Sequence, residues 1–323
     1  MIFKMVLMSN VSMSGKGFIF SVIAGVSGLL LVIAGINWYL DIYGLFRPVN
    51  NRKLPVYHTE RISKYLLSYR YIPQNFNTVL LGTSLSDNLD FSLHNDTYSA
   101  QKIYNASMMG ANIAEISPLV SNLLKGGVRN YVICVSPYLT KNYGSKEVEF
   151  DDKLYYGALG SKNLYETYVV GVIRHFSLMP SKFPKNQIDA NGVNDYGSFF
   201  AVGDVEQRVK RELKENTDAI KIDTAALAAF EAMIQELRAN QVRPLIYFHP
   251  VPYEIFKKKE KDFSYFQQKM SAIIQDDQSI INLNSENFKS FTADFTNYID
   301  HAHLSKKGQA RIVDTLLTRL KTH

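Results

Sequence analysis

Residues 77–84 read Asn-Thr-Val-Leu-Leu-Gly-Thr-Ser, and this stretch decides the fold. The apolar run from Thr78 to Leu81 has the length and composition of a short buried strand. Gly82 ends the run, and Ser84 follows just past the predicted carboxyl end of that strand. The segment therefore predicts a first strand with a serine hydroxyl at the edge of its sheet.

Further apolar runs on either side of helical stretches extend this pattern along the chain. The other predicted strands are 101–105, 131–135, 244–249 and 279–282, and the predicted helices are 57–71, 113–125, 224–240 and 306–320. Helices between strands indicate parallel β-α-β units. We therefore predict a three-layer α/β/α sandwich with a mostly parallel five-stranded sheet. Residues 141–222 interrupt the pattern with helical pieces at 162–176 and 204–215, so we expect an insertion that caps the sheet and shapes a cleft.

The N-terminal part of the chain has a different character. Residues 18–36 carry no charge and are followed by Trp38 and Tyr39, which predicts one transmembrane helix over residues 18–40. A cleaved signal peptide is the alternative, but bulky residues stand where a cleavage site would need small ones. Lys16 before the segment and Asp41 after it favour a cytoplasmic N-terminus, residues 1–17. Residues 41–75 then form a juxtamembrane linker and helix, and residues 76–323 a domain outside the cytoplasm of a bacterial plasma membrane.

Composition narrows the class of protein. Of the 323 residues, 46% are hydrophobic and 20% charged, as in folded proteins. The formal net charge of +6 is too small to indicate a nucleic-acid partner, and it is compatible with an anionic membrane or polysaccharide. The single cysteine, Cys134, permits no internal disulfide.

The segment Asp300-His301-Ala302-His303, before the last helix, complements Ser84. Acyl transfer through serine requires a hydroxyl, an imidazole that takes its proton, and a carboxylate that orients the imidazole. We predict these roles for Ser84, His303 and Asp300. Ser86 is an alternative nucleophile, and a simple turn or capping role remains open for each motif. A metal site on Asp300, His301 and His303 would need a further, distant ligand, so we predict no metal and no organic cofactor.

Two other residues lie where the rim of the sheet is expected. Gly110 follows the second predicted strand, where its N–H could stabilise an oxyanion together with that of Ser84, or where it could simply form a turn. His249 ends the fourth predicted strand, where it could contact substrate or bind a neighbouring loop.

The motifs Gly82-Thr83-Ser84, Gly110 and Asp300-His301-Ala302-His303, in this order, resemble those of the SGNH (GDSL-like) hydrolase family. The resemblance covers roughly residues 76–320. It implies a flavodoxin-like sheet with Ser84 as nucleophile, His303 as base, Asp300 as its orienting carboxylate, and Gly110 in the oxyanion hole.

The chain departs from the family pattern at two points. Thr83 stands where the family usually has Asp, and the third strand leads into Ser136-Pro137-Tyr138 rather than Gly-x-Asn-Asp. Gly192-Val193-Asn194-Asp195 matches those letters without a preceding strand. Asn194 and Asn142 are therefore both candidate oxyanion donors.

A membrane anchor and an altered third motif make the chain similar to the branch of the family that acts on envelope polysaccharides. The resemblance implies an O-acetyltransferase or acetylesterase. Its expected partners are an acylated polysaccharide, the lipid bilayer, and a membrane acyl-donor protein or polysaccharide synthase complex. Two alternatives remain open: a catalytically degenerate domain that binds glycan or docks to such a complex, and a lipid esterase that faces the cytoplasm.

Overall fold

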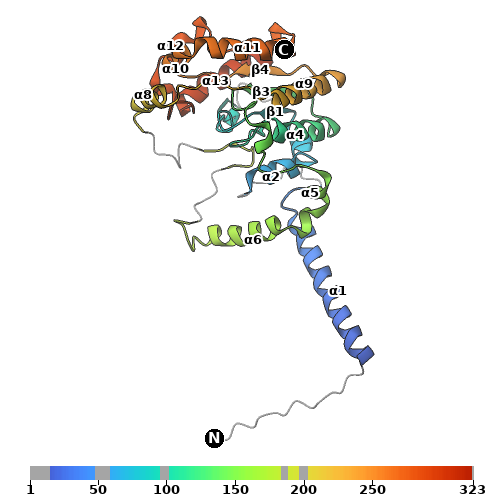
Figure 1. Ribbon diagram of the computed structural model, residues 1–323. Coiled ribbons are helices and arrows are strands. Elements are labelled where there is room, and N and C mark those ends of the chain that lie inside the picture. The colour runs from blue at the N-terminus through green and yellow to red at the C-terminus, as the bar shows by residue number, and fades with distance from the viewer. Residues whose placement is uncertain (1–14, 48–58, 95–101, 183–187, 196–202, 322–323) are drawn as a thin grey trace, which may run out of the picture. The chain divides into compact units, whose positions relative to one another are not determined.

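The computed structural model describes residues 15–47, 59–94, 102–182, 188–195 and 203–321, and the chain divides into two compact units, Met1–Ile42 and Tyr43–His323 (Figure 1). The described residues of the first unit form one helix, α1 (Gly15–Leu40), of 26 residues. By length and composition this helix could cross a membrane. The second unit contains the sheet and all the candidate site residues.

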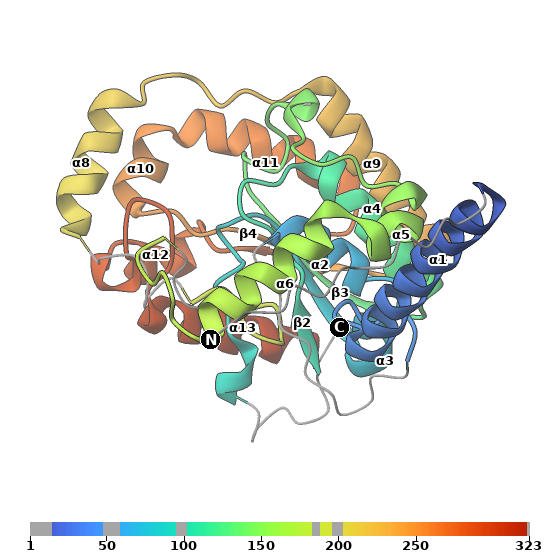
Figure 2. The same ribbon diagram turned by 90° about the horizontal axis from the view of Figure 1, so that it is seen from below.

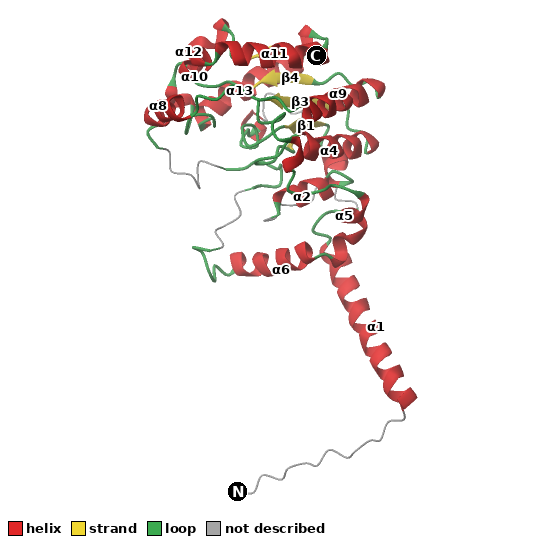
Figure 3. Ribbon diagram, viewed as in Figure 1, coloured by secondary structure: helices red, strands yellow, loops and turns green. Residues whose placement is uncertain are grey.

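Five parallel strands form the sheet of the second unit, in the order β2-β1-β3-β4-β5. Their bounds are β1 Thr78–Leu81, β2 Ile103–Asn105, β3 Asn130–Val135, β4 Leu245–Phe248 and β5 Ile280–Asn282. Figure 3 shows these strands in yellow among the helices. The prediction of a parallel five-stranded sheet is confirmed, although several strands are a residue or two shorter than predicted.

Helices cover both faces of the sheet, so the three-layer prediction is confirmed as well. On one face α9 (Thr224–Ala239) lies between α4 (Ile113–Lys125) and α11 (Glu260–Ile274) and contacts both. On the other face α13 (Lys306–Leu320) contacts a short 3-10 helix, Phe91–His94, and packs on the strands (Figure 2). Strands β1 and β4 are buried along their whole length, as expected for a sheet covered on both sides.

The remaining described helices of the second unit range from 4 to 14 residues in length. They are α2 Glu60–Leu67, α3 Tyr71–Asn75, α5 Asp152–Gly157, α6 Lys162–His175, α8 Val205–Glu215, α10 Tyr253–Lys258 and α12 Lys289–Thr292. The inserted region 141–222 contributes α5, α6 and α8.

The single helix predicted for residues 57–71 is wrong. Residues 57–58 lie outside the described residues, α2 ends at Leu67, and a second helix, α3, begins at Tyr71. The hydroxyl of Ser68, the C-cap residue of α2, donates a hydrogen bond to the Tyr65 carbonyl at 2.5 Å. Pro73 falls in the first turn of α3, where a missing N–H is tolerated, rather than beyond the end of one long helix.

Candidate functional site

Ser84 lies in a tight turn that directly follows β1, and its side chain is half-buried. The turn closes through hydrogen bonds from the N–H groups of Ser86 and Asp87 to the Thr83 carbonyl, at 3.1 and 3.2 Å. Gly82 is required here because an added Cβ would lie 2.2 Å from Ser86 Oγ. The sequence therefore folds into a compact turn that carries Ser84 at the carboxyl end of the strand.

Ser86, the alternative nucleophile, occupies a different environment. It is fully buried, and its hydroxyl donates to the Thr83 carbonyl at 3.2 Å and bonds to Ser107 Oγ at 2.8 Å. A hydroxyl held in this way supports the turn, so the burial of Ser86 favours Ser84 as the nucleophile.

Asp300 and His303 form a close pair in the loop before α13. The Nδ1 atom of His303 lies 2.8 Å from Asp300 Oδ2, and the N–H groups of Ala302 and His303 both donate to Asp300 Oδ1 at 2.7 Å. Burial by itself would raise the pKa of the Asp300 carboxyl. The hydrogen bond and charge of His303 and the two backbone N–H groups outweigh burial and lower that pKa below its usual range. A carboxylate on Nδ1 leaves His303 Nε2 as the nitrogen that accepts a proton.

The serine turn and the Asp300–His303 loop lie at the same rim of the sheet. The side-chain amide of Asn88, four residues after Ser84, donates to the Leu304 carbonyl at 3.0 Å. This bond joins residues that are 216 positions apart in the chain. The two motifs that the sequence places at opposite ends of the domain are thus brought together.

His249 supports the Asp300–His303 loop from the end of β4. Its Nε2 atom lies 2.9 Å from the Ala302 carbonyl, and its side chain is buried. Burial lowers the pKa of His249 to about 4, so the ring is neutral near pH 7 and Nε2 donates to that carbonyl. The ring also lines the cavity described below, so its predicted contact with substrate remains a prediction.

The loop that carries Gly110 follows β2 and is fastened to the serine turn. The Met108 N–H donates to the Gly82 carbonyl at 3.1 Å, and the Asn105 side chain donates to the Ser86 carbonyl at 2.8 Å. Gly110 is exposed and has a φ of +67°, a conformation that glycine adopts without strain. Its role as an oxyanion donor remains a prediction.

Asn194 packs against the serine turn although no strand precedes it. Its N–H donates to the Asp87 carbonyl at 2.8 Å, and its side-chain amide lies 3.5 Å from Asp87 Oδ2. Gly192 permits this approach, because an added Cβ would lie 2.1 Å from the Asn105 carbonyl oxygen. The inserted region therefore brings Asn194 to Asp87, three residues beyond Ser84. Asn142, the other candidate donor, lines the cavity instead.

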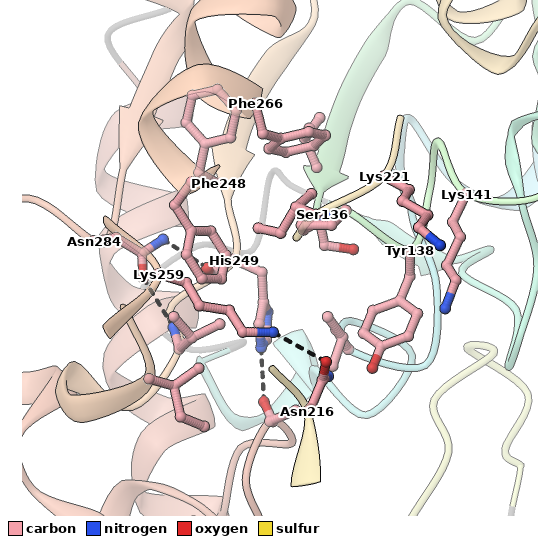
Figure 4. A pocket seen from close by; sticks show the side chains of 18 of the residues that line it. Ser136, Tyr138, Lys141, Asn216, Lys221, Phe248, His249, Lys259, Phe266 and Asn284 are labelled. Carbon is pink, nitrogen blue, oxygen red and sulfur yellow. Dashed lines mark hydrogen bonds between the residues drawn. The ribbon is translucent and has the colours of Figure 1, made fainter. Parts of the chain in front are cut away.

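A cavity of about 290 Å³ adjoins both motifs (Figure 4). Its lining includes Leu85, next to Ser84, and Ala302, next to His303, but neither Ser84 nor His303 itself. The apolar part of the wall consists mainly of Val135, Phe248, Val251, Ile255, Phe263 and Phe266, and the polar part includes Ser136, Tyr138, Lys141, Asn142, Asn216, Lys221, His249 and Lys259. The arrangement offers an apolar wall and a polar, lysine-bearing edge beside the catalytic candidates.

Sequence reasoning missed the residues that join these parts. Asn88 and Asn105 link the loops through their side-chain amides. The sequence signal for Asn88 is only that it belongs to a cluster of turn-forming residues, Ser86-Asp87-Asn88. Within the described ranges, no group of three or more His, Cys, Asp or Glu side chains is arranged to hold a metal ion.

Comparisons with known proteins give similarities among solved structures only. No family model and no curated protein matches the chain. An acetyl xylan esterase is similar with 10% identity and a TM-score of 0.42, over 75% of this chain and 98% of that one. A GDSL-like lipase from Bacteroides thetaiotaomicron has 9% identity and a TM-score of 0.39, over 78% and 91%. An esterase from Pseudoalteromonas sp. has 15% identity and a TM-score of 0.36, over 76% and 97%.

Proposed function

We propose that this chain is a membrane-anchored serine enzyme that transfers or hydrolyses an acyl group, most simply acetyl, on a cell-envelope polysaccharide. The observation that carries the proposal is the Asp300–His303 pair, with 2.8 Å between His303 Nδ1 and Asp300 Oδ2, held beside the Ser84 turn by the bond from Asn88. A carboxylate, an imidazole and a serine at one rim of a parallel sheet are the parts that acyl transfer requires.

The reaction follows from these roles. His303 Nε2 takes the Ser84 hydroxyl proton as Oγ bonds to the ester carbonyl carbon, and the carbonyl electron pair moves onto its oxygen. The N–H groups of Ser84 and Gly110 stabilise that oxyanion. The intermediate collapses, the C–O bond to the alcohol breaks, and His303 returns the proton to the leaving alcohol. Water or a sugar hydroxyl then gives its proton to His303 as its oxygen bonds to the acyl carbon. The bond from that carbon to Ser84 Oγ breaks, and His303 returns the proton to Ser84 Oγ, which restores the free enzyme.

The polar side of the cavity is evidence for a polar substrate group next to the acyl group. Figure 4 shows Lys141, Lys221 and Tyr138 on one side of the cavity, and Tyr138 is exposed. Exposed aromatic rings stack on sugars, and ammonium groups attract carboxylate or phosphate substituents. We therefore favour a negatively charged polysaccharide as the molecule that gives up or accepts the acyl group.

Labelling with a serine-reactive fluorophosphonate tests the proposal on the full chain in detergent. Wild type should be labelled, Ser84→Ala and His303→Ala should not, and Ser86→Ala, the matched control, should retain labelling. A folded wild-type protein that remains unlabelled, or labelling that persists in Ser84→Ala, would contradict the proposal. Acetate release from acetylated glycans, with and without an acceptor glycan, then separates esterase from transferase.

A degenerate, non-enzymatic domain is the second candidate. It is favoured by the turn after β3, where Ser136-Pro137-Tyr138 supplies no side-chain amide. In that case Ser84→Ala would leave the cellular role intact, whereas Lys141→Ala and Lys221→Ala would weaken binding to an anionic glycan.

A further inference from the structure

Helix α2 points three charged side chains into the protein. The side chain of Lys64 has no exposed surface, and those of Arg61 and Glu60 are 10% and 11% exposed. Charges are costly to remove from water unless they are paired and hydrogen-bonded. The partners of these three side chains therefore show which part of the protein the buried charges hold in place.

All three side chains bind the backbone of the loop that carries Gly110. Lys64 Nζ donates to the Ser107 carbonyl, and Glu60 Oε2 accepts from the Met109 N–H at 3.3 Å. Arg61 Nη2 donates to the Met109 carbonyl at 2.8 Å. Three consecutive peptide units, from Ser107 to Gly110, are thus each held by one residue of α2.

The bond from Arg61 has a direct consequence for Gly110. The Met109 carbonyl and the Gly110 N–H belong to one planar trans peptide unit, so they point in opposite directions. An arginine that holds the carbonyl therefore fixes the direction of the Gly110 N–H. Arg61 is itself held by Glu115 Oε1 at 2.5 Å, and the same carboxylate's Oε2 accepts from the Asn112 N–H in the capping box of α4.

We propose that Arg61 is a positioning residue that aims the Gly110 N–H at the oxyanion. This rests on the proposed function and adds α2 to the machinery of the site. In Arg61→Lys the single ammonium reaches Glu115 or the Met109 carbonyl but not both in the fork geometry of arginine. We expect kcat on an acyl ester to fall about 10- to 100-fold with KM within about twofold, since the loss of one oxyanion donor costs about 10²–10³ in rate.

The matched control is Arg70→Lys, because Arg70 donates to the Phe46 carbonyl at 2.9 Å and not to this loop. The paired variant Arg61→Gln/Glu115→Gln leaves no unpaired buried charge, so it should fold and show the same fall in kcat. Wild-type kcat in a folded Arg61→Lys protein would overturn the positioning role alone. A wild-type protein without esterase activity or fluorophosphonate labelling would overturn the proposed function, and the positioning role with it.

Helix α6 carries an exposed apolar stripe, which is a separate observation. Val169, Val172 and Phe176 are 58%, 54% and 65% exposed. At 100° per residue these side chains point the same way, opposite the buried Thr167 and Val170. Leu178 and Met179 extend the exposed apolar surface beyond the helix end. An apolar surface of this kind marks an interaction site.

Chain connectivity indicates what covers this stripe. Tyr43 is buried in the second unit, and its hydroxyl lies beside Thr167 of α6, which offsets part of the rise in its pKa that burial causes. Along the chain, only Asp41 and Ile42 separate Tyr43 from Leu40, the last residue of the apolar helix α1. His175 and Lys182 add basic residues next to the stripe, which suits anionic lipid headgroups.

We infer that the exposed face of α6 lies in the interface of a membrane with anionic headgroups. The test attaches a fluorescent probe to Val172→Cys in the full chain, in vesicles of phosphatidylethanolamine and phosphatidylglycerol that contain a lipid-bound quencher. Tyr265→Cys, on α11 and equally exposed, is the matched control. Cys134 is buried, and burial raises its pKa to about 12, so it stays unlabelled.

Quenching at position 172 and not at position 265 is the expected result. Equal quenching at both positions would overturn the inference. Protection of position 172 from a water-soluble quencher without lipid quenching would also overturn it, in favour of a protein partner. A third probe, at Leu30→Cys in α1, reports the anchor itself: no lipid quenching there would contradict the proposed anchoring, independently of α6.

Discussion

Helices α2 and α6 depart from the usual distribution of side chains in opposite ways. Helix α2 buries Arg61 and Lys64 and leaves little of Glu60 exposed, whereas α6 exposes Val169, Val172 and Phe176. Charged side chains are usually exposed and apolar ones usually buried, so a buried charge and an exposed apolar stripe are both informative. The charges of α2 are satisfied inside the protein by the Gly110 loop, and the stripe of α6 requires something outside it. We therefore expect the first helix to serve the proposed site and the second to contact the surroundings of the protein.

The largest loss of activity is expected from Asp300→Asn. This substitution leaves α2 and α6 unchanged, so its loss of kcat is the reference for the losses in the variants of α2. An amide would favour the wrong tautomer of His303, so kcat should fall by about 10³–10⁴. Steady-state hydrolysis of an acetyl ester measures this loss. Asp294→Asn, which removes an exposed pair with Lys307, is the control and should retain nearly full activity. An equal loss in both variants would mean that Asp300 acts only through the fold.

Two lysines, Lys64 in α2 and Lys162 in α6, test the difference between the two helices directly. Glu60–Lys64 in α2 and Lys162–Glu166 in α6 are both pairs four residues apart, with N–O distances of 2.9 and 3.1 Å. Lys64→Met should lower the free energy of unfolding by about 3–5 kcal/mol, because it leaves buried partners unsatisfied. Lys162→Met should change it by less than about 0.5 kcal/mol. Denaturant titration followed by circular dichroism measures both, and similar losses would remove the distinction between the helices.

The buried imidazole of His249 predicts how the stability of the folded protein depends on pH. Its folded pKa of about 4 lies below the usual value of about 6.5, so the unfolded chain binds more protons between these values. Stability should therefore fall by about 2 kcal/mol as the pH is lowered from 7 to 4.5. In His249→Gln, which can still donate to the Ala302 carbonyl, this part of the pH dependence should vanish. A variant with the wild-type pH profile would show that folding does not lower the pKa of His249.

The smallest effects are expected within α6 itself. Val170 is 8% exposed and Val172 is 54% exposed. Val170→Ala should cost about 1–2 kcal/mol of unfolding free energy, whereas Val172→Ala should change it by no more than about 0.5 kcal/mol. The same titration in detergent measures both variants. A larger loss at Val172 would indicate that its stripe packs against protein and not against lipid.

The parts of this protein that were predicted from the sequence depend on local patterns. Short apolar runs between helices predicted all five strands, and the spacing of Asp300 and His303 predicted their hydrogen bond. Ser305, a residue type that favours helix N-caps, caps α13, and its hydroxyl accepts from the Gly308 N–H at 3.2 Å.

The contacts that assemble the site depend on the packing of distant segments, and no local pattern indicates them. Lys64 sits in an amphipathic stretch where a lysine is normally solvated, yet the Gly110 loop covers it. Asn194 matched a family motif in letters, but only the fold shows that it meets Asp87. The exposed stripe of α6 was missed for a related reason, since sequence does not reveal which of two apolar helix faces is covered.

The bond from Asn88 to Leu304 also limits the order in which the proposed site can assemble. Its two ends are separated by 216 residues, which take about ten to forty seconds to synthesise. Helix α1 leaves the ribosome at the start of that interval, so we expect the chain to be delivered to the membrane before the proposed base, His303, and the proposed carboxylate, Asp300, have been made. The proposed roles therefore predict that the nascent protein is catalytically silent until Asp300 and His303 have been made, and that chains truncated before Asp300 lack activity.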